Sequence, residues 1–211
     1  MCLAEQFGIS VVPHSLIRMK DGELSYITRR IDRLPSGEKI AMEDLCQLSE
    51  RTTEYKYKSS YEQVAKVIRE YSSIPEMDLT RYYELLIFCW LTGNNDMHLK
   101  NFALYNPKDE GFCLTPAYDL LNAALVNPKD KEELALTLNG RKKNIKPADF
   151  AQAMQRAGIS DRVISNIFHK FQKKYPEWEL TIRDSFLPKD YQEAFWQMIC
   201  ERLSRLRENP I

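Results

Sequence analysis

The sequence predicts a mainly helical domain of the α+β class, with one short β-hairpin near the N-terminus and a second in the middle of the chain. At 211 residues the chain is long enough for one domain with a sizeable core. From about residue 60 onward, apolar residues recur at helical spacing. Only two segments, 11–31 and 101–115, place β-type or alternating residues on both sides of a turn, which is typical of hairpins.

The first 40 residues contain a short helix and the first hairpin. Leu3, Ala4 and Phe7 share one face of a helix that ends at Gly8, and nothing precedes this helix to cap it, so we expect it to have lost its beginning. The turn KDGE then joins two segments rich in β-branched and aromatic residues, VVPHSLIRM and LSYITRRI. They predict two strands and are the only extended segments we expect before residue 100.

The next segments lead into the helical part. Residues 33–40 form a Pro/Ser/Gly loop, residues 42–50 read as a short helix, and the polar stretch 51–60 is expected to be mobile. A helix follows over 61–71, and 78–91 is apolar nearly all round, which predicts a buried central helix that Gly93 ends. Three amphipathic helices are predicted near the C-terminus, over 147–158, 160–175 and 188–209.

Composition excludes several classes of protein. Thirty basic and thirty acidic residues balance, so the chain lacks the electrostatic footprint of a protein that binds nucleic acid by itself. Five cysteines, without C-x-x-C spacing and mostly among apolar neighbours, suit a reducing cytoplasm. No apolar run approaches the ~20 residues that span a bilayer, so we expect a cytoplasmic protein with no membrane partner.

The second hairpin brings polar residues together. Asp96 and Asn101 lie just before its outgoing strand, and Asp119 lies just after its returning strand. The two ends of a hairpin are adjacent, so these three side chains should meet at its open end, at the rim of an apolar core. Two carboxylates and an amide oxygen suit Mg²⁺, which prefers oxygen ligands. We expect all three within reach of one metal ion.

The spacing of these residues points to phosphoryl transfer. Asp96 and Asn101 form D-x-x-x-x-N, the arrangement in which a kinase catalytic loop carries its base and a metal-binding Asn, with a further metal-binding Asp beyond. In this interpretation Asp96 accepts the proton of an attacking hydroxyl, while Asn101 and Asp119 hold metal against the phosphates.

The motifs FCWLTGNNDMHLKNFALYN, FCLTPAYDLL and YITRRIDRLPSGEKIAMEDLCQLS resemble the HipA family, Ser/Thr protein kinase toxins of bacterial toxin–antitoxin systems. The resemblance covers nearly the whole chain and implies a protein-kinase-like C-terminal helical lobe over 41–211, with a remnant of the N-terminal lobe and hinge over 1–40. It implies ATP and Mg²⁺ as cofactors, Asp96 as catalytic base, and Asn101 and Asp119 on the metal. The residues it places on the nucleotide are Arg29, Arg30, Ile31 and Asp32 at the hinge, His98, Leu99, Lys100 and Asn101, and Tyr118 and Asp119. Family members often carry an acidic and then an aromatic residue in the hinge, where this chain has Arg29 and Ile31.

The resemblance also implies a partner and missing parts. The partner is a DNA-binding, HipB-like antitoxin. All seven glycines lie at least fourteen positions apart, so the chain contains no Gly-rich phosphate-binding loop. We expect this loop and the strand that carries the phosphate-binding Lys to lie upstream of Met1, or in a separate N-terminal lobe protein. The isolated chain is then expected to be inactive and to bind Mg·ATP weakly or not at all.

The candidate site residues could also have simpler, structural roles. Asp96 could cap a helix, Asp119 could cap a helix over 120–126, His98 could bond a backbone carbonyl, and Lys100 could be a solvated charge. A metallohydrolase needs more His than the chain offers, and we interpret His14 and His169 as structural. The large aromatic residues of the predicted helices are expected in the core: Tyr82, Phe88, Trp90, Phe168, Phe171, Phe195 and Trp196. The competing function is a non-catalytic kinase-fold module that binds an antitoxin or another lobe.

Overall fold

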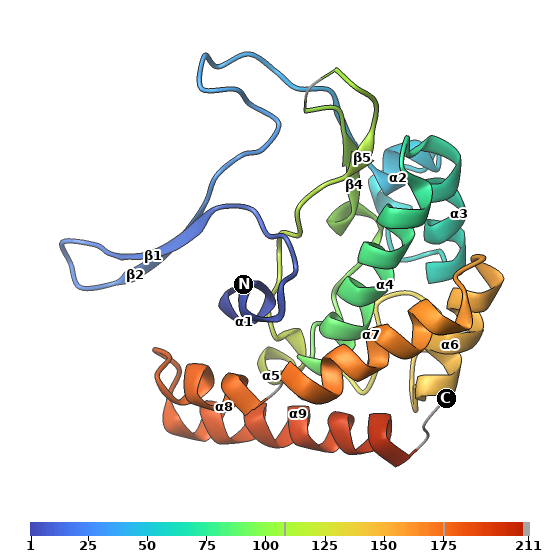
Figure 1. The fold of residues 1–211 in the computed structure, drawn as a ribbon. Coiled ribbons are helices and arrows are strands. Elements are labelled where there is room, and N and C mark those ends of the chain that lie inside the picture. The colour runs from blue at the N-terminus through green and yellow to red at the C-terminus, as the bar shows by residue number, and fades with distance from the viewer. Residues whose placement is uncertain (108, 175, 209–211) are drawn as a thin grey trace.

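The computed structural model describes residues 1–107, 109–174 and 176–208. A body of helices carries two small antiparallel sheets, and the hairpin of the first sheet projects away from this body (Figure 1). The predicted mainly helical α+β architecture is therefore confirmed. The longer helices are α3 (Tyr61–Tyr71), α4 (Pro75–Leu91), α6 (Pro147–Arg156), α7 (Asp161–Lys174), α8 (Pro176–Arg183) and α9 (Lys189–Glu208). The short ones are α1 (Cys2–Phe7), α2 (Leu45–Leu48), α5 (Ala123–Val126) and the 3₁₀ turns η1 (Thr53–Tyr55) and η2 (Leu99–Asn101).

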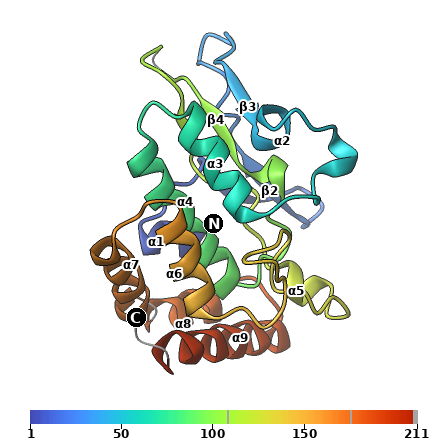
Figure 2. The same cartoon turned by 90° about the vertical axis from the view of Figure 1, so that its right-hand side faces the viewer.

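Helix α4 lies at the centre of the fold, as its uniformly apolar sequence predicts. It starts at Pro75, three residues before the predicted start, because proline at the first helical position gives up no intrahelical hydrogen bond. Tyr82, Phe88 and Trp90 are buried on different sides of it, and α3, α6 and α9 pack around it (Figure 2). This rigid helix fixes the position of the loop that follows Gly93.

Aromatic side chains join the two ends of the chain. Phe7, on α1, stacks on Phe171 with ring centroids 4.0 Å apart and meets Trp178 edge-on at 5.9 Å. Helix α1 is thereby anchored in the helical body, while the β1–β2 hairpin that follows it is mostly exposed. Phe168 and Phe171 are buried as expected, and Phe195 and Trp196 are partly buried against the core.

The first hairpin is confirmed, with shorter strands than predicted. Strands β1 (His14–Arg18) and β2 (Leu24–Thr28) pair antiparallel, with Leu16 opposite Tyr26. The second hairpin is also confirmed, as β4 (Ala103–Tyr105) and β5 (Cys113–Leu114).

The prediction of one helix over 42–50 is wrong in its first part. Residues Met42–Asp44 form a strand, β3, which pairs with β4 and places Glu43 opposite Leu104. Helix α2 begins only after Asp44, whose side chain accepts the Gln47 N–H, while the Gln47 side chain accepts the Asp44 N–H. The pairing partner of β3 lies some 60 residues further along the chain, so nothing local in the sequence indicates the strand.

Three of the C-terminal helices were predicted, and α8 was not. Helix α8 lies between the second and third predicted helices, and its Trp178 and Ile182 lie one helical turn apart and are buried. All five cysteines lie in the described part and are free thiols. None of the described helices combines the length and the apolar character that crossing a membrane requires.

Candidate functional site

The loop after α4 begins with a sharp turn at Gly93. Its φ of 75° lies in the left-handed region, and a Cβ there would come within 2.6 Å of Asn122 Oδ1. The turn lets the Asn94 N–H bond back to the Cys89 carbonyl at 2.8 Å and directs the chain toward Asp96.

Asn94 connects the two halves of the site. Its side chain is buried; Oδ1 accepts the backbone N–H of Asp96, and Nδ2 donates to the backbone carbonyl of Asp119, each at 3.3 Å. One side chain therefore holds the loop before the β4–β5 hairpin against the loop after it. Sequence reasoning missed Asn94, and its only signal was its position between Gly93 and Asp96.

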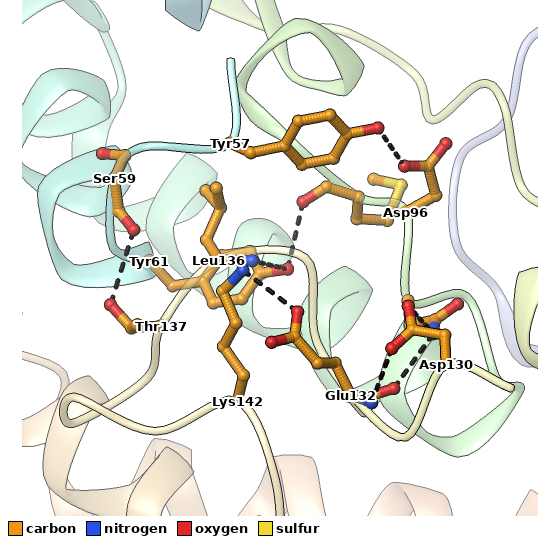
Figure 3. Close-up of polar contacts among 11 residues, drawn as sticks. Tyr57, Ser59, Tyr61, Asp96, Asp130, Glu132, Leu136, Thr137 and Lys142 are labelled. Atoms are coloured by element: carbon orange, nitrogen blue, oxygen red, sulfur yellow. Dashed lines mark hydrogen bonds and ion pairs between the residues drawn. The ribbon is translucent and has the colours of Figure 1, made fainter. Parts of the chain in front are cut away.

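The Asp96 carboxylate is held by a tyrosine from a distant segment. Its Oδ1 accepts a 2.6 Å hydrogen bond from the Tyr57 hydroxyl, which reaches it from the 51–60 segment (Figure 3). Burial raises the pKa of Tyr57 to about 12, helped by this hydrogen bond and by the charges of Asp96 and Asp119. Helix capping by Asp96 is excluded among the described contacts, since its carboxylate accepts this hydroxyl instead of a helical N–H. The segment we expected to be mobile thus makes a specific contact with the site.

Asn101 closes the Asp96 loop. Its Nδ2 donates to the Asp96 carbonyl at 3.0 Å, and its side chain is buried in η2. This bond turns the amide so that Oδ1 has no protein partner in the described part of the chain. An amide oxygen without a protein partner is available to a ligand.

Asp119 adopts a strained backbone conformation. Its φ of 55° is left-handed, which is uncommon for a residue with a side chain and occurs often at functional sites. Asp119 is exposed, and its carboxylate has no protein partner among the described residues. The proposal that it caps the following helix is wrong, because Asn122 Oδ1 accepts the Leu125 N–H of α5 at 3.0 Å.

His98 is buried and neutral at neutral pH. Burial, and then the nearby Lys56 charge, lower its pKa below the usual value. The ring meets Tyr57 edge-on at 4.9 Å, and Nδ1 has no hydrogen-bond partner among the described residues. A bond from His98 Nδ1 to a backbone carbonyl, the simpler role considered above, is absent there. The neighbouring Leu99 side chain is fully buried in the core.

The predicted hinge residues line a cavity of about 350 Å³. Arg30 holds Asp32 through two bonds of 2.9 and 2.6 Å, from Nε and Nη2. The cavity brings together six of the predicted nucleotide-binding residues, namely Arg29, Arg30, Ile31, Asp32, Lys100 and Tyr118. It is not lined by Asp96, His98, Leu99, Asn101 or Asp119.

Two bonds connect this hinge cavity to the Asp96 loop. Lys100 Nζ pairs with Asp44 Oδ2 at 3.0 Å, which raises the Lys100 pKa through a hydrogen bond and opposite charge. The Tyr118 hydroxyl donates to the Lys100 carbonyl at 2.9 Å, and burial raises the pKa of Tyr118. Lys100 is therefore paired rather than simply solvated.

The oxygen atoms present fit a hard cation. Within the described ranges, no three His, Cys, Asp or Glu side chains form a metal-binding group. Mg²⁺ in a phosphoryl-transfer site needs only one or two protein oxygens, because phosphates and water complete its coordination. The Asp119 carboxylate and Asn101 Oδ1 are such oxygens, and neither has a protein partner in the described part.

The two remaining histidines lie outside this site: His14 faces Cys2 and the Val12 carbonyl, and His169 is exposed.

Comparison with solved structures shows the class of fold. The chain superposes on HipA, in the solved complex of the Shewanella oneidensis MR-1 toxin–antitoxin system HipA and HipB with operator DNA, with a TM-score of 0.80 and 19% identity. This match covers 99% of the chain and 54% of that protein. The Helicobacter pylori proinflammatory kinase CtkA matches with a TM-score of 0.59 and 16% identity, over 97% of this chain and 77% of that one. The fold is therefore that of a kinase-like domain.

Sequence comparison identifies the family. The model of the HipA-like C-terminal domain matches residues 1–178, and the chain belongs to this family. Two Sinorhizobium fredii proteins are similar: "Putative kinase Y4dM" is 29% identical over 64% of this chain and 33% of its own length, and "Putative kinase Y4mE" is 30% identical over 67% and 35%. A "Putative kinase" of Haemophilus influenzae is 24% identical over 70% of this chain and 48% of its own. The chain thus spans a third to a half of the curated relatives that it matches.

Proposed function

We propose that this chain is the catalytic portion of a HipA-like Ser/Thr protein kinase toxin, which transfers the γ-phosphoryl group of ATP to a protein hydroxyl. The observation that carries the proposal is the bridge made by Asn94, which holds the backbones of Asp96 and Asp119 together. Around this bridge, Asp96 Oδ2, Asn101 Oδ1 and the Asp119 carboxylate have no protein partners in the described part of the chain.

Each residue then has a separate task. As the substrate hydroxyl oxygen forms a bond to the γ-phosphorus and the bond to the ADP leaving group breaks, Asp96 accepts the hydroxyl proton. Asn101 and Asp119 would hold Mg²⁺, which when bound neutralises charge on the phosphates. The hinge cavity would receive the adenine end of ATP, with Lys100 and Tyr118 between the hinge and the Asp96 loop.

The proposal includes a cytoplasmic protein with two kinds of partner. A HipB-like antitoxin is one, supported by the HipB-containing complex of the structural neighbour. An N-terminal lobe, in cis or in trans, is the other. Two facts support this: the matched relatives extend well beyond the shared part, and the seven isolated glycines offer no phosphate-covering loop.

A specific observation also favours the non-catalytic alternative. A second cavity, of about 820 Å³, is lined mainly by apolar side chains such as Leu16, Leu24, Phe186 and Phe195, and by none of the predicted site residues. A surface of this kind suits binding of another protein segment. A binding module would need this surface and not the carboxylates.

Transfer of labelled phosphate from ATP to a protein acceptor tests the two functions. The full chain is assayed alone and after addition of a separately produced N-terminal lobe from a HipA-like relative. We expect no transfer by the chain alone and measurable transfer with the lobe. Robust turnover by the chain alone would contradict the need for a lobe. A folded chain that gains no activity from any lobe would favour the non-catalytic module.

A further inference from the structure

The contact between Tyr57 and Asp96 is the feature that the mechanism above does not use. The phenol donates to Oδ1 at 2.6 Å, a length typical of a hydroxyl bonded to a charged carboxylate. The other oxygen, Oδ2, has no partner among the described residues. One oxygen of the candidate base is thus occupied by the protein, while the other is available to a substrate.

Tyr57 is 42% exposed, and its ring is held on one side by two neighbouring side chains. Its ring lies edge-on to His98 at 4.9 Å with an interplanar angle of 82°, and Lys56 Nζ lies 5.0 Å from its ring centre. The backbone of the same segment is held as well, because the Leu99 N–H donates to the Lys56 carbonyl at 3.2 Å. A little further on, the Tyr61 hydroxyl donates to the Met97 carbonyl at 3.0 Å. It also accepts the Leu136 N–H at 3.5 Å (Figure 3). These contacts hold the backbone on both sides of Tyr57 and so bring its hydroxyl to Asp96.

We infer that Tyr57 is a positioning residue: its hydroxyl holds Asp96 Oδ1 so that Oδ2 is presented to the hydroxyl of the protein substrate. The inference rests on the proposed function, because it needs Asp96 to act as base. A carboxylate without this bond can rotate about its last side-chain torsion, which has a broad energy minimum. Proton acceptance depends on hydrogen-bond distance and direction, so a freely rotating carboxylate is productive less often.

The kinetic test compares Tyr57→Phe with wild type in the lobe-supplemented transfer assay. Phenylalanine keeps the ring against His98 and removes only the hydroxyl. We expect kcat to fall about ten- to a hundredfold, the range that small misplacement of a catalytic group causes, and KM for ATP to stay within about twofold, because Tyr57 does not line the hinge cavity. Tyr55→Phe is the matched control, since Tyr55 lies in the same segment and is similarly exposed, at 49% against 42% for Tyr57, while the hydrogen bond to Asp96 comes from Tyr57; it should leave both constants unchanged.

The opposite outcomes are informative. An unchanged kcat in Tyr57→Phe would overturn the positioning role. A raised kcat would also overturn it, and would mean that the phenol blocks the place of the substrate hydroxyl. No transfer by wild type with any lobe would remove the proposed function and this inference together, whereas wild-type transfer with a normal Tyr57→Phe enzyme removes this inference alone.

A second readout needs no activity. In the full chain with ring-labelled tyrosine, the Tyr57 signal is identified by its loss in Tyr57→Phe, and its ionisation is followed by NMR as pH rises. The negative charge of Asp96 favours the protonated phenol, so Asp96→Asn should move the ionisation of Tyr57 from about pH 12 to a lower pH. The same ionisation pH in both proteins would show that the contact does not persist in solution and would overturn the inference.

Discussion

At the scale of single residues, the site depends on which oxygen atoms remain free after the protein has satisfied its own hydrogen bonds. The Asn101 side chain donates its amide N–H to the Asp96 carbonyl, which leaves its Oδ1 without a partner in the described part of the chain. Asp96 Oδ1 accepts the Tyr57 hydroxyl, and Oδ2 has no partner among the described residues. The atoms left over are those that proton transfer and oxygen-preferring metals require.

Asp96→Ala should abolish phosphoryl transfer by the lobe-supplemented chain while leaving it folded. The residue is asked to accept a proton and does not pack in the core, and the lost Tyr57 hydrogen bond is worth roughly 1–3 kcal/mol. Transfer is measured with labelled ATP, and folding by circular dichroism and thermal unfolding. Asp184→Ala, which removes an exposed carboxylate elsewhere, should keep full activity. Near-normal turnover of Asp96→Ala would refute the role of Asp96.

Asp119→Ala should relieve any growth arrest that expression of the active form causes in bacteria, because the variant loses a proposed Mg²⁺ ligand. Asp109→Ala is a matched control: Asp109 also has a left-handed φ, of 58°, and lies in the exposed β4–β5 turn. Both variants carry the same backbone penalty, so a difference in colony growth reports the carboxylate. Arrest that persists in Asp119→Ala would indicate that toxicity comes from binding.

At the scale of elements, the ends of α4 and of the β4–β5 hairpin have to meet for the site to exist. Gly93 makes this possible, since it ends α4 in a conformation that costs other residues roughly 1–2 kcal/mol. Its missing side chain also leaves room for Asn122 and Met198, to which a Cβ would come within 2.6 and 2.7 Å.

Gly93→Ala should therefore destabilise the protein more than Gly140→Ala. Both glycines have a φ near 75°, but a Cβ at Gly140 meets no atom within 4 Å. The difference between their free energies of unfolding, measured by denaturant titration, isolates the steric cost, which we expect to be about 1–3 kcal/mol. Equal destabilisation by the two substitutions would show that the crowding around Gly93 relaxes freely.

At the scale of the whole molecule, the helical core and the proposed nucleotide site have different requirements. The hydrophobic core is built from segments of this chain, since α3, α6 and α9 pack around α4 and Phe7 of α1 stacks on Phe171 of α7. The proposed nucleotide site offers the predicted hinge residues and carboxylates, but the isolated glycines provide no backbone N–H cluster for the phosphates.

The isolated chain should therefore unfold cooperatively and bind Mg·ATP weakly. Calorimetric titration should give a Kd for Mg·ATP at least about tenfold tighter once the N-terminal lobe is added, because the phosphates then gain their donors. Thermal unfolding of the chain alone should show one transition. Tight binding of Mg·ATP by the chain alone would contradict this division.

Local patterns in the sequence were sufficient for most elements. The buried helix α4, the flanking amphipathic helices and both hairpins follow from apolar spacing and turn residues, because these signals act within a few positions of one another. The sequence also predicts that Asp96, Asn101 and Asp119 converge on one end of the second hairpin, since a hairpin returns the chain to its starting point, and this stays a prediction for their side chains.

Contacts between residues far apart in sequence required the tertiary structure. Tyr57 meets Asp96 across 39 positions, Lys100 meets Asp44 across 56, and Asn94 meets Asp119 across 25. Strand β3 and the hinge cavity likewise depend on partners from remote segments. Such contacts produce no local pattern in the sequence, because they form only once packing around α4 has brought the segments together. The sequence by itself determined the candidate residues for the proposed phosphoryl transfer, and the tertiary structure decided how their oxygens are held and which of them stay free.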